Sequence, residues 1–154
     1  TPTLQRGPGR MVAVFGPSGS LRWQTGTTPS VFVAAGTGVA PFRAMLQAGL
    51  PGSGDSPVLL LFGARREQDI LWHDELDALS RRHPRLRFVP TLSRGSERWA
   101  GRRGRVQEHF AELVAPLTER GASVYVVGQS SMVDDCVGQL EAELGVPRSR
   151  IFRE

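Results

Sequence analysis

The stretch of this sequence best suited to binding chemistry is Gly36-Thr37-Gly38, which follows the apolar run Val31–Ala35. A short continuous apolar run predicts a strand buried on both faces, and the two glycines indicate a tight turn after it. Pro41 stands where a helix should begin, because its fixed φ suits the first helical turn. Free backbone N–H groups at a helix start favour an anion. We therefore predict a phosphate site at this turn.

The glycine turn alone leaves an alternative open. Its spacing is not GxGxxG, so it does not match the dinucleotide fingerprint, and a plain tight turn of an α/β protein would use the same residues. What favours the binding interpretation is the arrangement of the rest of the chain.

Few other residues form a catalytic or metal-ligating pattern. The single cysteine, Cys136, excludes an internal disulfide framework and a cysteine-rich metal or iron–sulfur site, and we expect it to be a buried helix residue. His73, Asp74 and Glu75 are adjacent, so they point in different directions on a helix, which disfavours a metal site. His109 has no evident partner. We predict no metal centre.

Charge and length narrow the class of protein. The 154 residues are enough for one domain with a sizeable core. All 19 basic residues are arginine, yet the net charge is only +4, and no platform of aromatic and basic residues accompanies them, so nucleic-acid binding is disfavoured. No apolar run is long enough for a membrane span and no signal-peptide pattern is present. We expect a cytoplasmic protein.

Strand and helix patterns alternate along the chain. Residues 1–10 are predicted to form a loop or tail. Met11–Phe15 is predicted to form a strand, which ends in a turn at residues 16–19. The predicted strands that follow are Val31–Ala35, Val58–Phe62, Leu86–Leu92, Ser123–Gly128 and Ile151–Phe152. The predicted helices are Phe42–Leu50, Asp69–His83 with Asp69 as its cap, Val106–Leu117 and Ser131–Leu144. A polar loop is predicted over Ser93–Arg105.

This alternation predicts a three-layer, Rossmann-like α/β fold, with a parallel five-stranded sheet and helices on both faces. In such a sheet, ligands bind beyond the carboxyl ends of the strands, where the strand order reverses. Gly36, Gly63 and Gly128 each follow or close a predicted strand. Their agreement places the predicted binding site at that edge.

Six short motifs, in order, resemble the pyridine-nucleotide domain of the ferredoxin–NADP reductase family. They are GTGVAPF at 36–42, FGAR at 62–65, LSR at 92–94, WxGxxGxV at 99–106, VGxxxM at 127–132 and IxxE at 151–154. The resemblance implies the strand order 3-2-1-4-5, with the five strands numbered along the chain from Val31–Ala35. It also implies a flavin-dependent oxidoreductase, in which NADPH or NADH passes a hydride to FAD or FMN and the electrons go on to an acceptor protein.

The resemblance also implies which residues form the site. The residues expected to bind the nucleotide are Gly36, Thr37, Gly38, Val39, Ala40, Pro41, Gly63, Arg65, Ser93, Arg94, Arg103, Arg105, Gly128, Gln129 and Met132. Those of the GTGVAP turn would hold the pyrophosphate and nicotinamide side, and Ser93 and Arg94 would flank the adenosine ribose. Gly128 and Met132 would border the nicotinamide. Glu154 matches a catalytic glutamate beside the flavin edge.

Two alternatives remain for the adenosine end. The Ser93-Arg94 pair and the arginines near it would favour NADPH, since its 2′-phosphate carries nearly two negative charges. The same arginines would contribute little if they form only a solvated loop, and the Trp99-x-Gly101 pattern resembles members that use NADH. We favour NADPH.

The sequence departs from the family pattern in two informative places. Val127-Gly128-Gln129 stands where many members have Cys-Gly-Pro, so no thiol is expected beside the nicotinamide. The motif of the family's flavin-binding barrel is absent. We expect residues 1–22 to be a tail and the last strand and turn of that barrel, and residues 23–154 to be the NAD(P)H-binding domain.

It follows that FAD would be bound by a domain on the same longer chain, and that this chain alone would neither retain flavin nor be active. The remaining alternative is a nonenzymatic module that binds a nucleotide or a partner without electron transfer.

Overall fold

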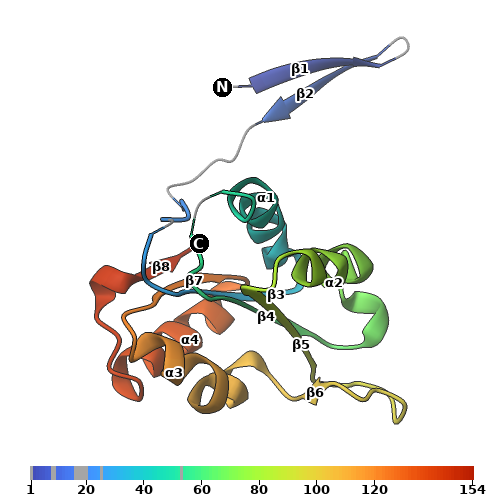
Figure 1. Ribbon diagram of the computed structural model, residues 1–154. Coiled ribbons are helices and arrows are strands. Elements are labelled where there is room, and N and C mark those ends of the chain that lie inside the picture. Colours follow the sequence, from blue (N-terminus) through green and yellow to red (C-terminus); the bar gives the residue numbers. More distant parts are fainter. Residues whose placement is uncertain (1, 8–9, 16–20, 25, 53) are drawn as a thin grey trace.

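The structure, a computed structural model, describes residues 2–7, 10–15, 21–24, 26–52 and 54–154. Its main feature is a parallel sheet of six strands in the order β6-β5-β4-β3-β7-β8 (Figure 1). The strands are β3 (Ser30–Ala35), β4 (Val58–Ala64), β5 (Leu86–Leu92), β6 (Arg102–Arg103), β7 (Ser123–Val127) and β8 (Ile151–Arg153). The predicted five strands and their order are confirmed. The sixth, β6, is a two-residue edge strand inside the predicted loop.

The strand register aligns the carboxyl ends of neighbouring strands. Ala35 of β3 lies opposite Gly63 of β4, and Gly63 lies opposite Thr91 of β5. On the other side, Ala34 pairs with Val127 of β7. The residues that follow these strands therefore share one edge of the sheet.

Helices cover both faces of the sheet, as predicted (Figure 1). One face carries α1 (Ala40–Gly49) and α2 (His73–Arg82); the other carries η3 (Val106–His109), η4 (Phe110–Val114), α3 (Ala115–Thr118) and α4 (Ser130–Ala142). Short turns of 3₁₀ helix, η1 (Gly36–Val39), η2 (Glu67–Asp69) and η5 (Arg148–Arg150), lie in the connections.

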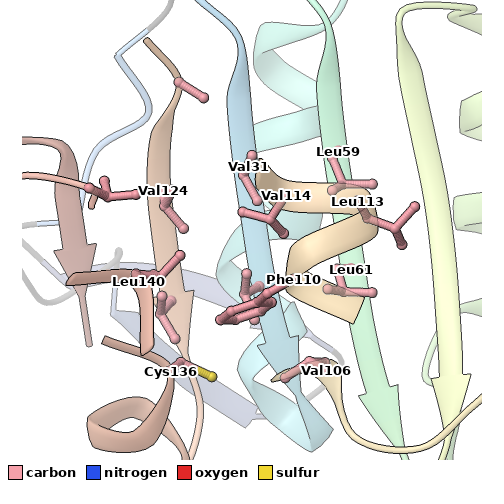
Figure 2. Packing of buried hydrophobic residues seen from close by; sticks show 14 of the residues in the cluster. Val31, Leu59, Leu61, Val106, Phe110, Leu113, Val114, Val124, Cys136 and Leu140 are labelled. Carbon is pink, nitrogen blue, oxygen red and sulfur yellow. The ribbon is translucent and has the colours of Figure 1, made fainter. Parts of the chain in front are cut away.

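Alternate residues of the central strands fill two separate cores. On the α1 and α2 side, Phe32 packs against Phe42 with ring centroids 4.8 Å apart. On the other side, Val31, Leu61 and Phe110 are fully buried together (Figure 2). Burial on both faces is why these strands have continuous apolar sequences.

Two predicted helices differ from the structure. The helix predicted from Asp69 begins at His73, because the Asp69 carboxylate accepts a hydrogen bond from the Arg66 N–H and so closes η2 instead. Trp72, immediately before α2, has a φ of 52°. The helix predicted over Val106–Leu117 is present, but it passes through 3₁₀, π and α geometry in turn.

The N-terminal residues form a hairpin. β1 (Pro2–Gly7) pairs antiparallel with β2 (Arg10–Phe15), and the two form a sheet of their own. The strand predicted at Met11–Phe15 is confirmed, whereas the loop or tail predicted for residues 1–10 is wrong, since β1 is the strand that pairs with it. The turn predicted at residues 16–19 lies outside the described residues.

The segment before β3 is attached to the main sheet by its side chains and backbone. The indole Nε1 of Trp23 donates to Ser30 Oγ at 2.9 Å, and its ring occupies the space beside Gly49. The Gln24 N–H donates to the hydroxyl of buried Tyr125, also at 2.9 Å. Among the described residues, no helix is both long and apolar enough to cross a bilayer.

Candidate functional site at the carboxyl edge of the sheet

The carboxyl ends of β3 and β7 form the centre of the candidate site. The chain adds strands on one side of β3 up to β6 and then returns to place β7 on the other side, so the strand order reverses between β3 and β7. This is the position at which open α/β sheets bind ligands. Gly36 and Gly38 follow β3, and Gly128 follows β7. The structure thus brings the first and last of the predicted nucleotide-binding segments together.

Gly36 and Gly38 serve different purposes. Gly36 has a φ of 56°, which favours glycine, and a Cβ there would meet no atom within 4 Å. A Cβ at Gly38 would overlap the Val127 carbonyl oxygen and lie 2.8 Å from its carbon. A side chain would thus fit beside the turn at Gly36 but not at Gly38. Gly38 lets the turn pack on the backbone of β7.

The turn leads directly into α1. Val39 is fully buried in the core, so it offers a ligand no accessible surface. Ala40 and Pro41 form the first turn, where Pro41 has the expected helix-initiating place and no acidic side chain is present. Thr37 is exposed and caps neither η1 nor α1. Its hydroxyl is thus available to a ligand at the positive end of the helix.

A second part of the site lies at the ends of β4 and β5. The ladder between these strands continues past them, because the Ser93 N–H donates to Ala64 O at 3.0 Å and the Arg94 N–H to Arg65 O at 2.7 Å. The structure thereby places Arg65 and Arg94 side by side, both exposed. Within the described residues neither guanidinium has a hydrogen-bond or ion-pair partner.

Gly63 lies deeper in the structure than the site. A Cβ at this position would be 2.9 Å from Val106 Cγ1, so its missing side chain makes room for η3. Its expected place beside the dinucleotide is therefore limited to its backbone, which lies at the predicted edge.

The loop after β5 is held by Arg103. Its Nη1 donates to Gly95 O at 3.0 Å, and its Nη2 donates to Ser96 O at 2.6 Å and to Trp99 O at 2.7 Å. Arg105 is exposed at the start of η3, where its N–H donates to the Glu108 carboxylate. Of the two arginines expected near the ribose, Arg103 thus has most of its donors directed into the protein.

His109 has partners that the sequence does not indicate. The Thr91 hydroxyl donates to Gly104 O at 2.9 Å, so it accepts from His109 Nε2, also at 2.9 Å. Arg102 lies 3.5 Å from the other ring nitrogen and forms two hydrogen bonds with Glu112. The sequence shows no evident partner for His109, and the structure supplies Thr91, which lies eighteen residues earlier in β5. This network fixes β6 to β5 and η3.

The far end of the edge carries the remaining predicted residues. Met132, in the first turn of α4, has its Sδ 2.8 Å from a Cβ built on Gly128, so the two are in contact. Gln129 is exposed between them. Glu154 continues the sheet, because its N–H donates to Val126 O at 3.0 Å, and its side chain is exposed. Its carboxylate is separated from the arginines by the whole width of the site.

Two cavities within the described part of the chain lie away from this edge. One of about 360 Å³ lies between α1 and α2, and another of about 200 Å³ between α4 and β8. No group of three or more metal-ligating side chains occurs among the described residues. Cys136, as predicted, is a fully buried helix residue. The candidate site is therefore an open edge of backbone and arginine, suited to an extended anionic ligand.

Comparisons with known proteins agree with this arrangement. A family model described as an oxidoreductase NAD-binding domain matches residues 32–138. Ferredoxin–NADP reductase B of Sorangium cellulosum is 44% identical over 96% of this chain and 62% of its own length. The XylA electron transfer component of the Pseudomonas putida xylene/toluene monooxygenase is 34% identical over 95% of this chain and 41% of its own length.

Among solved structures, the Amycolatopsis cytochrome P450 reductase GcoB superposes with a TM-score of 0.81 and 30% identity, over 95% of this chain and 44% of that one. The chain therefore spans between two fifths and two thirds of the length of these three relatives.

Proposed function

Because this chain belongs to the oxidoreductase NAD-binding domain family, we propose that it is the NAD(P)H-binding module of a flavin-dependent oxidoreductase. The observation that carries the proposal is the edge at which β3 and β7 diverge. There, open backbone at Gly36 meets the start of α1, with unpaired arginines on one side and Glu154 on the other. An extended dinucleotide has its negative charge where this edge offers N–H groups and guanidinium groups.

Each part of the edge has a proposed task. The turn from Gly36 to Pro41 binds the pyrophosphate through backbone N–H groups and the Thr37 hydroxyl. Gly128, Gln129 and Met132 border the nicotinamide. When bound, NAD(P)H would supply a hydride. Glu154 would place a carboxyl group beside the flavin that accepts it.

We propose that the nucleotide is NADPH. Arg65 and Arg94 are adjacent, exposed and without partners among the described residues. A charge-assisted hydrogen bond contributes about 1.5 to 3 kcal/mol, so two of them to a 2′-phosphate, after discounting for the solvent exposure of both arginines, would favour NADP⁺ over NAD⁺ by about tenfold or more. Arg105 extends the same positive surface.

The remaining parts of the proposal concern the longer protein. FAD would be bound by a separate domain on the same chain, to which the hairpin of β1 and β2 would belong, with the NAD(P)H-binding domain starting near residue 23. An electron-acceptor protein would take the electrons, and the protein would work in the cytoplasm. Relatives named as a ferredoxin reductase and as a monooxygenase electron transfer component support this role.

Calorimetric titration of the chain with NADP⁺ and with NAD⁺, at two salt concentrations, tests the proposal. We expect saturable binding, with NADP⁺ tighter by tenfold or more and more strongly weakened by salt. Arg94→Ala should abolish most of that preference, whereas Arg120→Ala, an exposed arginine away from the edge, should not.

Three results would count against parts of the proposal. Absence of binding by both nucleotides would contradict the module itself, and equal loss of NADP⁺ and NAD⁺ affinity in Arg94→Ala would contradict the 2′-phosphate assignment. A stoichiometric flavin spectrum in the purified, dialysed chain would contradict the assignment of FAD to another domain.

A further inference from the structure

The loop that joins β5 to β6, residues 93–101, is held from two sides by groups that belong to other segments. We propose that Glu67 and Arg103 are positioning residues, which brace this loop so that Arg94 faces the adenosine end of the nucleotide. The inference rests on the proposed function and adds to it: Glu67 gains a role, and Arg103 acts through the loop instead of touching the phosphate.

Glu67 holds the loop from the side of β4. It lies in η2, three residues after the end of that strand, and is half-buried. Its Oε1 accepts two hydrogen bonds from Ser96, one from the backbone N–H at 3.0 Å and one from the hydroxyl at 2.5 Å. The hydroxyl bond is the largest cause that lowers the pKa of the Glu67 carboxyl, and the charge of Arg103 adds to it. The brace thus carries a full negative charge at neutral pH.

Arg103 holds the same loop from the side of β6. Three backbone carbonyls, those of Gly95, Ser96 and Trp99, point at its two terminal nitrogens. Both protons of Nη2 are engaged, because this nitrogen donates to two acceptors. A lysine has one donor atom instead of a planar fork and could not reach all three carbonyls.

Trp99 fills the centre of the loop. Its Nε1 donates to Arg102 O at 2.7 Å. A Cβ at Gly101 would overlap the indole ring, and one at Gly95 would lie 3.1 Å from it. The two glycines therefore give the ring its place, and the loop has a packed interior although its surface is polar.

The brace acts on Arg94 through a short path. Arg94 stands two residues before Ser96, and its own N–H is fixed to Arg65 O. With both ends of residues 94–96 held, the backbone that carries the Arg94 side chain has one conformation before a ligand arrives. Binding then avoids the entropic cost of ordering the loop. Ser93 and Arg94 would flank the adenosine ribose that NADP⁺ and NAD⁺ share, so without the brace the cost of ordering the loop falls on both nucleotides.

The test compares variants of the intact chain by calorimetry with NADP⁺ and NAD⁺. Glu67→Ala and Arg103→Lys should each weaken both nucleotides by the same factor, about three- to tenfold. Glu67→Gln keeps an acceptor oxygen for Ser96 and should lie between Glu67→Ala and the unchanged chain. Glu97→Ala and Arg98→Ala, exposed residues of the same loop, are the matched controls and should leave both affinities unchanged.

Amide hydrogen exchange provides the second readout. Glu67→Ala should speed exchange of the amides of residues 94–99 while β3 and β4 keep their protection, which separates loosening of the loop from loss of global stability. The inference is overturned if Arg103→Lys weakens NADP⁺ alone, since Arg103 would then be a phosphate ligand. It is also overturned if Glu67→Ala binds both nucleotides normally. Failure of the unchanged chain to bind either nucleotide would instead contradict the proposed function.

Discussion

A methyl group added at Gly38 would meet backbone, whereas one added at Gly36 would meet open space. From the sequence the two glycines are indistinguishable, because both follow a buried strand within one short turn. The difference comes from β7, which lies more than eighty residues further along the chain and passes close to only one of them. The sequence could therefore predict the turn but not which glycine packs against β7.

Gly38→Ala should destabilise the protein by about 1 to 3 kcal/mol, because the backbone of Val127 and Gly128 must move to admit the new methyl group. The free energy of unfolding in urea would measure the loss. Gly138→Ala is the matched control. This glycine is exposed within α4 and has open space around it, so alanine should stabilise the helix by about 0.5 to 1 kcal/mol. If Gly38→Ala left the free energy of unfolding unchanged, the close packing of the turn at Gly38 on the backbone of β7 would be contradicted.

Elements with a strong local signal were predictable, and those that depend on distant partners were not. The central strands β3, β4 and β7 needed no other information, since each is buried on both faces. β6 has only two residues, both arginine, and it exists because Thr91 and His109 hold the chain beside β5. The start of α2 was predicted too early because the Asp69 carboxylate closes a separate turn.

The helices α1 and α2 are joined by one ion pair. Arg43 donates through Nε and Nη2 to the two carboxylate oxygens of Glu75 at 2.8 and 2.9 Å, and Gln47 donates to the same group. The side chains of Arg43 and Glu75 are 33% and 39% exposed. The hydrogen bond from Arg43 is the largest cause that lowers the pKa of Glu75 below its usual value.

Because the folded state lowers this pKa, it binds a proton less readily than the unfolded state does. The stabilising contribution is complete above the unfolded pKa, near 4.5, and is lost as the pH falls through the folded value. The urea midpoint of the protein should therefore decrease as the pH falls below about 4.5. Glu75→Gln should have a lower midpoint at neutral pH and a smaller decrease on acidification. A parallel decrease in both proteins would assign the acid sensitivity to other carboxylates, such as Glu112 beside Arg102.

For the molecule as a whole, the fold class and the edge that carries the site follow from the order of strands and helices. The sequence also singled out Arg65 and Arg94, which the structure brings together. It could not indicate Glu67, Thr91 or Trp99 as supports of the loop, because each acts through hydrogen bonds or packing that only the folded chain forms. A carboxylate directly after an arginine pair, as Glu67 is after Arg65 and Arg66, has no sequence signal of its own.

Tyr125 helps to attach the segment before β3, which includes Gln24, to the main sheet. Its ring stacks on Phe152 with centroids 5.0 Å apart, and its hydroxyl accepts from the Gln24 N–H. Tyr125→Phe should keep the packing of the ring but lower the free energy of unfolding by about 0.5 to 1.5 kcal/mol, because the hydrogen bond to Gln24 is lost. Hydrogen exchange at the Gln24 amide should accelerate, while exchange in β7 stays slow. Unchanged protection at Gln24 would show that the hydroxyl does not fix this segment.

Cys136 is the chain's single thiol, and it lies in the core beneath α4, near Phe110 and Leu140 (Figure 2). Burial raises the pKa of this thiol to about 12. Alkylating reagents need an accessible thiolate, so they can modify the protein only when this core opens. The rate of alkylation is thus a clock for opening, built into the native chain. Nucleotide that binds only the folded state should slow this clock, which would report binding without any chromophore, flavin or redox partner.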